Sequence, residues 1–185
     1  ITDKIRLKLD KLKQKGVIGH EDEISITEKQ TNQDLLGPIL DLAKKDPVLK
    51  NFELKETLAT ISDFINNDSI PKKILDHLSI FSHLNPTAFE NTLLNLVFGT
   101  HIGKANNYST NELNELISVL FFENIGYARL HPNMKNAKLV HPILSKEIVK
   151  IAGLENKLVL ESIEQHEEKL DGSGYPNKLT EIHEY

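Results

Sequence analysis

Hydrophobic residues recur at helical spacing along most of the 185-residue chain. Between residues 110 and 126 the apolar side chains lie three and four positions apart, which places them on one face of an α-helix. Residues 23–28 instead alternate with period two, which predicts a short strand or an extended linker. Taken together, the pattern predicts an all-α helical bundle. Further helices are expected over residues 3–16, 35–45, 52–65, 71–81, 86–104, 139–152 and 154–168.

Capping signals support two of these helix starts. Asn85 precedes Pro86; an asparagine side chain accepts hydrogen bonds from the free N–H groups of a first helical turn, and proline suits that turn. Ser109 and Glu112 have the spacing of a capping box, in which each side chain accepts a hydrogen bond from the backbone N–H of the other residue. We therefore expect helices to begin directly after Asn85 and Ser109.

The charge and composition of the chain exclude several classes of protein. Its 22 basic and 27 acidic side chains give a net charge of −5, whereas general binding to nucleic acid or anionic membranes needs a surplus of Lys and Arg. No apolar run approaches the ~20 residues that span a bilayer, and the absence of Cys excludes disulfides, thiolate metal sites and a Cys nucleophile. We expect a cytoplasmic protein with no nucleic-acid partner and no membrane segment. Because the first residue is Ile, we also expect the chain to be cut at its ends.

Candidate chemistry is concentrated in residues 165–176, which read QHEEKLDGSGYP. Two glycines permit a tight turn after the last predicted helix, and this turn exposes an aspartate and a tyrosine. The string resembles the HHExxDGxGYP signature of the HD-GYP family, which comprises bacterial metal-dependent phosphodiesterases of cyclic di-GMP. Seven of the eight specified letters match, and Glu167 replaces the second His of the signature. The matching residues are His166, Glu168, Asp171, Gly172, Gly174, Tyr175 and Pro176.

The resemblance implies two further motifs upstream. The family has a helix that ends in His-Asp-Ile-Gly-Lys, and here Glu123 stands for its metal-binding His, Asn124 for its bridging Asp and Tyr127 for its Lys. The family also has a His-Pro pair, which is matched by His141 and the proline after it, and an earlier ligand His, whose place is near Asn91. His141 follows Asn124 by 17 positions, a shorter gap than in the family, so either a loop has been deleted or part of it is missing from the sequence.

The departures from the family pattern predict a weakened metal site. Of the family's ligands His141 and His166 are retained, while Glu123 and Glu167 offer carboxylates where the family has histidines. Asn124 is neutral, and a neutral side chain is a poor bridge between two cations. We therefore expect no bound cofactor; if one is bound, it is a single divalent ion (Fe, Mn or Mg). The ligands of such an ion would be His141, His166, Glu123 and Glu167.

The resemblance covers roughly residues 85–185 and implies an HD-domain-like bundle there. We therefore divide the chain into an N-terminal accessory helical region, residues 1–80, and a degenerate HD-GYP domain, residues 81–185. The last metal-binding Asp of the family would lie beyond Tyr185, so this domain is expected to be truncated at its C-terminus. A sensor or dimerisation role for residues 1–80 stays open.

The substitutions at the site decide the expected function. Tyr127 removes a positive charge that faces substrate phosphate in the family, in addition to the lost bridging carboxylate. We therefore expect a non-catalytic regulatory or binding module in bacterial cyclic di-GMP signalling. Its expected partners are cyclic di-GMP and cyclase-type or other signalling proteins that contact the Gly-Tyr-Pro loop. The alternative is an active metal-dependent cyclic di-GMP phosphodiesterase with a rearranged metal site.

Overall fold

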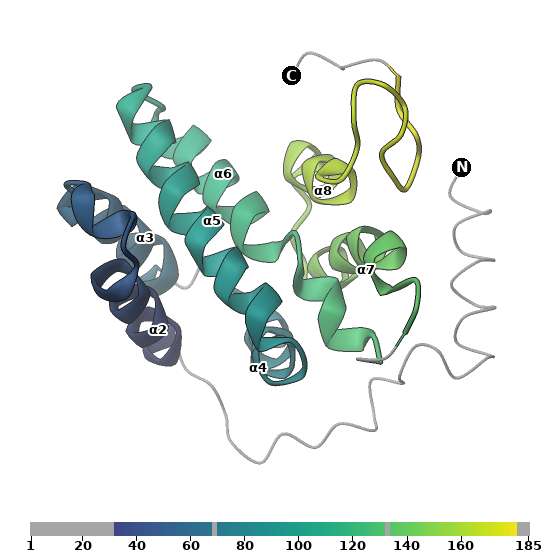
Figure 1. Ribbon diagram of the computed structural model, residues 1–185, viewed down its shortest axis with the longest axis horizontal. Helices are drawn as coiled ribbons and strands as arrows, with labels where there is room; N and C mark the ends of the chain where they lie inside the picture. Colours follow the sequence, from purple (N-terminus) through teal and green to yellow (C-terminus); the bar gives the residue numbers. More distant parts are fainter. Residues whose placement is uncertain (1–31, 68–69, 132–133, 181–185) are drawn as a thin grey trace.

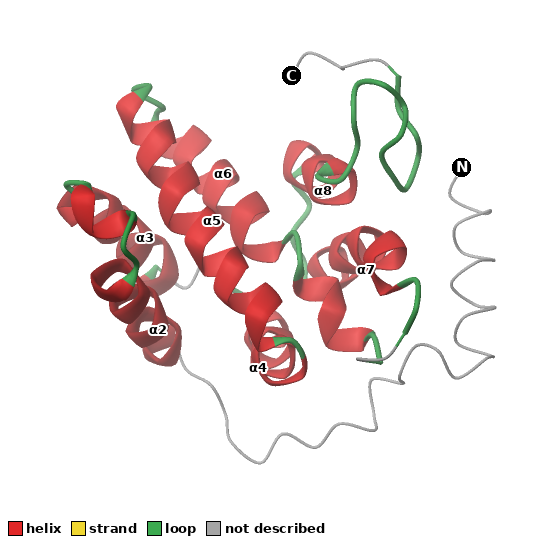
Figure 2. Cartoon of the chain, viewed as in Figure 1, coloured by secondary structure: helices red, strands yellow, loops and turns green. Residues whose placement is uncertain are grey.

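The computed structural model describes residues 32–67, 70–131 and 134–180, and these form helices joined by loops, with no strand (Figures 1 and 2). The prediction of an all-α protein is confirmed for this part of the chain. The helix expected at 3–16 and the strand or linker expected at 23–28 lie outside the described residues. The α-helices are α2 (Asn32–Lys45), α3 (Lys55–Asn66), α4 (Lys72–Leu84), α5 (Pro86–Ala105), α6 (Thr110–Phe122), α7 (Ala137–Ile151) and α8 (Lys157–Gln165), and the 3-10 helices are η2 (Leu49–Asn51) and η3 (Ile125–Arg129).

Both predicted caps are confirmed. The side chain of Asn85 accepts a hydrogen bond from the N–H of Ala88 at 3.3 Å, and α5 begins at the next residue. The Ser109 hydroxyl accepts from the N–H of Glu112 at 3.4 Å, and the Glu112 carboxylate accepts from the N–H of Ser109 at 2.7 Å. These local side-chain bonds satisfy N–H groups that have no partner within a helix, and they fix where α5 and α6 begin.

Six predicted helix bounds are wrong by three or four residues. The start expected at 35 lies at Asn32, and the ends expected at 81 and 168 lie at Leu84 and Gln165. The helix expected from residue 52 begins at Lys55, and the one expected from residue 154 begins at Lys157, because the side chain of Asn156 caps it by accepting from the N–H of Val159 at 3.1 Å. The helix expected to reach residue 126 ends at Phe122, and the chain then tightens into η3. This last change has a tertiary cause, since η3 packs closely against α7.

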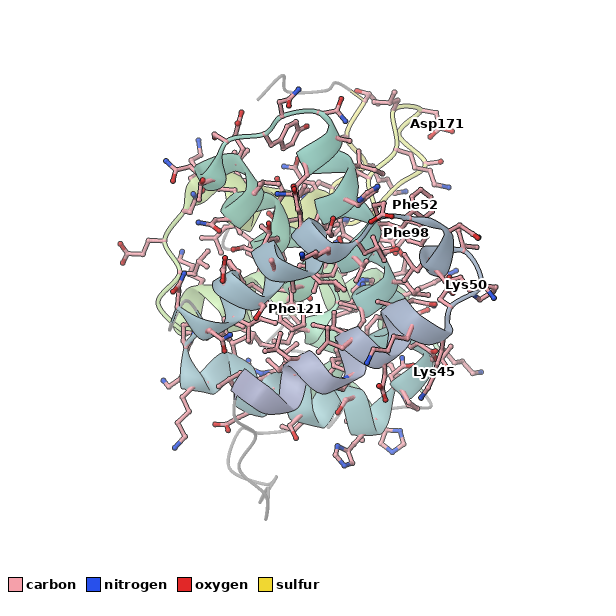
Figure 3. All side chains as sticks on the ribbon, turned by 90° about the vertical axis from the view of Figure 1, so that its left-hand side faces the viewer. Lys45, Lys50, Phe52, Phe98, Phe121 and Asp171 are labelled. Atoms are coloured by element: carbon pink, nitrogen blue, oxygen red, sulfur yellow. The ribbon has the colours of Figure 1, made fainter. Side chains whose placement is uncertain are left out.

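Helix α5 occupies the centre of the bundle (Figure 1). It packs against α2, α3 and α4 and against α6, while α8 contacts α6 and α7, and η3 contacts α4 and α7. All seven α-helices of the described residues contribute apolar side chains to one buried core, in which Phe121 is fully enclosed (Figure 3). A smaller apolar cluster, with Leu144 at its most buried point, lies between η3 and α7.

Residues on both sides of position 80 share the main core, and α4 itself runs across that position. The division at residue 80 stays a prediction. Within the described ranges no helix is both long enough and apolar enough to cross a membrane.

Candidate metal centre

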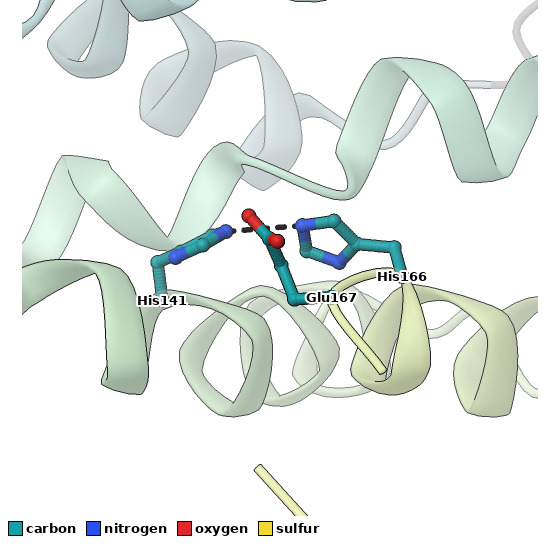
Figure 4. Close-up of side chains that lie close together, drawn as sticks. All are labelled: His141, His166 and Glu167. Carbon is teal, nitrogen blue, oxygen red and sulfur yellow. Dashed lines mark hydrogen bonds between the residues drawn. The ribbon is translucent and has the colours of Figure 1, made fainter. Parts of the chain in front are cut away.

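Three side chains that sequence analysis singled out meet where α7 approaches the end of α8 (Figure 4). They are His141 on α7, His166 directly after α8, and Glu167, and one potential ligand atom from each lies within 4.8 Å of the others. The Nε2 atoms of the two histidines are 3.0 Å apart. Two imidazole nitrogens and one carboxylate therefore converge on a single point.

His141 is fully buried and is held on two sides. Its Nδ1 faces the backbone oxygen of Lys138 at 2.8 Å, and its ring stacks on the ring of Tyr127, with centroids 4.3 Å apart and an angle of 14° between the planes. A backbone oxygen only accepts hydrogen bonds, so Nδ1 carries the proton. In a neutral ring this leaves Nε2 with a free lone pair.

His166 is oriented in the same way by the end of α8. Its Nδ1 donates to the backbone oxygen of Ile163 at 2.8 Å, and that oxygen belongs to the last four carbonyls of the helix, which have no intrahelical donor. The rings of His166 and His141 lie edge to face, with centroids 5.0 Å apart. Both Nδ1 atoms therefore face carbonyl oxygens, and both Nε2 atoms face each other.

The facing Nε2 atoms create an electrostatic conflict. A hydrogen bond between two neutral rings would need one ring to move its proton from Nδ1 to Nε2, which would turn a bare Nδ1 toward a carbonyl oxygen. A charged ring would avoid this, but burial together with the neighbouring His166 lowers the pKa of His141 to about 3, and burial also lowers the pKa of His166. A metal cation that accepts both lone pairs resolves the conflict.

Glu167 is tied to the loop that follows it. Its backbone oxygen accepts from the N–H of Tyr175 at 3.2 Å, and its carboxylate is hydrogen-bonded to the Tyr175 hydroxyl. Burial, followed by this bond and the negative charge of Glu167, raises the pKa of Tyr175, so the hydroxyl remains a donor. Burial and the same charge raise the pKa of Tyr127. A hydrogen-bonded carboxylate of this kind is held in one orientation, as metal-binding carboxylates are.

Glu123 lies beside this group and is not part of it. Its side chain interacts with Asn95 and accepts from the side-chain amide of Asn124 at 3.3 Å. Only 8% of Glu123 is exposed, and this burial, with the charge of Glu167 as a smaller contribution, raises its pKa to about 7. The amide of Asn124 also donates to the hydroxyl of Thr92 at 3.2 Å. The role of Glu123 as a ligand stays a prediction.

Two carboxylates of the matched signature shape the loop and are not part of the group of three potential ligands. The Glu168 carboxylate accepts from the N–H groups of residues 177, 178 and 179, and these bonds hold the end of the loop close to its start. Asp171 accepts from the N–H of Ser173 at 2.9 Å and from its hydroxyl at 2.6 Å, and it lies exposed at the edge of the molecule (Figure 3).

The glycines and the proline of the signature also serve the loop conformation. Gly172 has a φ of +71°, which favours glycine, and a Cβ on Gly174 would lie 2.3 Å from the backbone nitrogen of Lys169. The peptide bond between Tyr175 and Pro176 is cis. The matched signature therefore contributes its ligands through His166 and Glu167, while the rest of it builds the loop.

Sequence analysis missed Ser145, which joins the candidate site to the scaffold. Its hydroxyl donates to the backbone oxygen of Glu123 at 2.6 Å and accepts from the N–H of Gly126 at 2.8 Å. Ser145 lies one helical turn after His141, so the spacing of four residues was the available signal. Asn91, near the place that the resemblance assigns to the earlier ligand His, is exposed, and the side chain that interacts with Glu123 is Asn95, one turn later.

Comparison of the chain with protein-family models, with curated proteins and with solved structures found no match. The resemblance of residues 165–176 to the HD-GYP signature therefore stays a prediction.

Proposed function

We propose that this chain is a degenerate HD-GYP domain that binds one divalent metal ion and serves as a non-catalytic regulatory or binding module in bacterial, cytoplasmic cyclic di-GMP signalling. The observation that carries the metal site is the pair of Nε2 atoms, 3.0 Å apart, whose rings are both oriented by carbonyl oxygens at Nδ1. The carboxylate of Glu167 completes a set of three donors.

The donor set suits a single ion of the Fe²⁺ or Mn²⁺ type. Two imidazole nitrogens favour these ions over Mg²⁺, which prefers oxygen ligands and retains much of its water. When bound, such an ion supplies a Lewis-acidic centre with positions open to water or to an anionic ligand. His141, His166 and Glu167 would hold it, and Tyr175 would fix the orientation of the Glu167 carboxylate.

The absence of a second ion and of phosphodiester cleavage is supported by the surroundings of Asn124. A second cation needs an anionic bridge to offset the repulsion between the two ions, and Asn124 is neutral. Its amide nitrogen is engaged by Thr92 and Glu123. Tyr127 stacks on His141, where the family has a lysine for substrate phosphate. These three features favour a binding role over hydrolysis.

The loop formed by residues 168–179 supports a protein partner. It is fastened at both ends of its turn by Glu168 and by the bond between Tyr175 and Glu167. Near its start Leu170 is 69% exposed, the highest value among the large apolar residues in the described part of the chain. A rigid loop that presents an apolar side chain suits docking of a cyclase-type or other signalling protein.

Metal analysis of the full 185-residue chain tests this proposal. We expect one equivalent of Mn²⁺ to bind, measured by loss of the electron paramagnetic resonance signal of the free aqueous ion. Glu167→Gln and His166→Gln should each weaken binding by at least about tenfold, while His83→Gln, on the exposed end of α4, should not. Calorimetry should detect binding of cyclic di-GMP to the loaded protein, and chromatography should detect no linear product. Two bound ions, no bound ion, or cleavage of cyclic di-GMP would each contradict the proposal.

The second candidate is an active phosphodiesterase, and the environment of Glu123 favours it. A carboxyl with a pKa of about 7 can exchange a proton near neutral pH, and this one is buried close enough to Glu167 to respond to its charge. Turnover of cyclic di-GMP with Mn²⁺ that is lost in Glu123→Gln would establish this alternative. Glu56→Gln, at an exposed position on α3, is the control.

A further inference from the structure

Helix α7 contains a proline in its interior, at the sixth of its fifteen residues. Pro142 has no N–H, so it cannot make the helical hydrogen bond to the backbone oxygen four residues earlier, and its ring pushes that carbonyl aside. The carbonyl concerned belongs to Lys138. It is the same oxygen that accepts the hydrogen bond from Nδ1 of His141, at 2.8 Å.

Two other histidines in helices make a different contact. In α4, Nδ1 of His77 and of His83 lie within 2.7 and 2.9 Å of the carbonyl oxygens four residues earlier, Lys73 and Ser79. His141 also interacts with the backbone of Ala137, four residues earlier, but its hydrogen bond of 2.8 Å goes to the carbonyl three residues earlier, whose normal helical donor would be residue 142.

His166 also donates to a carbonyl that has no helical donor, but that carbonyl is free for a different reason. It also donates to the carbonyl three residues earlier, that of Ile163, and this oxygen lacks a helical donor because α8 ends at Gln165. In one histidine a proline frees the acceptor, and in the other the end of the helix does.

We propose that Pro142 is a positioning residue for His141: by leaving the Lys138 carbonyl without a helical donor, it fixes the proton of His141 on Nδ1 and directs the bare Nε2 toward His166. The consequence for metal affinity rests on the proposed metal site, whereas the position of the proton does not. The residue after a histidine thus decides which ring nitrogen is available for coordination.

Pro142→Ala tests the inference, because it restores an N–H at residue 142 that competes with His141 for the Lys138 carbonyl. In the metal-free chain, ¹⁵N NMR of the imidazoles should show His141 protonated on Nδ1 in the wild type and a mixture of both tautomers in the variant. The affinity for Mn²⁺ should fall about 10- to 100-fold, the usual effect of losing a residue that orients a ligand. Pro38→Ala is the matched control, since Pro38 also lies inside a helix, α2, and is exposed.

Circular dichroism establishes that each variant is folded before these measurements. A folded Pro142→Ala chain with unchanged tautomer and unchanged Mn²⁺ affinity would overturn the inference. So would a wild-type His141 with its proton on Nε2, a result that needs no variant. If the tautomer shifts in the variant but the wild type binds no Mn²⁺, the positioning role of Pro142 stands and the proposed metal site fails.

Discussion

The two regions of the molecule bury polar groups in different ways. Among the described residues between 32 and 122, which we call the scaffold region, the buried polar side chains are hydroxyls. Three of them bond within their own helix (Thr92 to Ala88, Thr100 to Leu96 and Ser118 to Asn114), while Thr57 bonds to His101 across α3 and α5. In residues 123–180, the site region, the buried polar side chains include Glu123, His141, Ser145 and Glu164, whose hydrogen bonds cross between helices.

The hydroxyls of the scaffold region suit a packing role, whereas the ionisable groups of the site region can take part in chemistry. A hydroxyl that donates to a carbonyl of the preceding turn finds its acceptor within its own helix and needs no acceptor from the rest of the fold. A buried ionisable group costs much more free energy, unless it is paired or neutral. Glu164 is paired with Lys146 across α7 and α8, but Glu123 and His141 form no ion pair within the described residues. Unpaired buried ionisable groups mark functional sites; here His141 belongs to the candidate metal centre and Glu123 lies beside it.

Titration of Glu123 is expected to give the largest effect that separates the two regions. Its pKa is raised from 4.5 to about 7 in the folded chain, so folding favours the protonated form. This contribution to stability is fully present below pH 4.5 and is lost as the pH rises through about 7. The free energy of unfolding should fall by about 3 kcal/mol over this range through Glu123 alone.

Urea unfolding of the wild type and of Glu123→Gln between these pH values, with a chelator present, measures that contribution. Burial lowers the pKa of His141 and of His166, so their contributions change in the opposite direction, as the pH falls below 6.5. They are common to both proteins and cancel in the difference. Identical pH profiles for the two proteins would show that Glu123 does not titrate in this range.

Paired glycine substitutions test how tightly the two regions are packed. A Cβ on Gly126 would lie 2.2 Å from the backbone oxygen of His141 and 2.8 Å from the nitrogen of Ser145. Because backbone atoms cannot move aside locally, Gly126→Ala should reduce the free energy of unfolding by about 2.5 kcal/mol.

Gly37→Ala is the counterpart in α2, where a Cβ would meet nothing within 4 Å. The gain in helix propensity is opposed there by the preference of a residue before Pro38 for extended backbone, so we expect a change below about 1 kcal/mol. Chemical denaturation of both variants gives the comparison. Equal effects would mean that η3 and α7 are not held together at Gly126.

The parts of the fold that depend on neighbours in sequence were predictable. The capping box of Ser109 and Glu112 joins residues three positions apart, so its hydrogen bonds follow from the sequence alone. The 3-10 helix η3 was not predictable in this way. Gly126 donates to a hydroxyl 19 residues later, and only the approach of α7 makes that bond possible.

The candidate site shows the same division. His141, His166 and Glu167 were found through the spacing of motifs, and the fold brings them within coordination range of one another. Glu123 was grouped with them from its motif position, but its separation from the group depends on the bonds it makes to Asn95 and Asn124. No periodic pattern in a sequence encodes a bond such as that between Glu123 and Asn95, which lies on α5.

Removing one buried hydroxyl from each region gives the smallest expected difference in the free energy of unfolding. It compares the two regions through the same kind of group. Ser145→Ala leaves the N–H of Gly126 and the carbonyl of Glu123 without their partner in the interior, and we expect it to lower the free energy of unfolding by about 1.5 kcal/mol. Thr100→Val removes a bond to the carbonyl of Leu96, which keeps its helical donor, so about 0.5 kcal/mol is expected. Only Ser145→Ala should also weaken binding of Mn²⁺, because Ser145 holds η3, and with it Tyr127, against His141. If both variants lose the same stability and retain the same Mn²⁺ affinity, the hydroxyl of Ser145 serves packing alone and the candidate metal centre consists only of His141, His166 and Glu167.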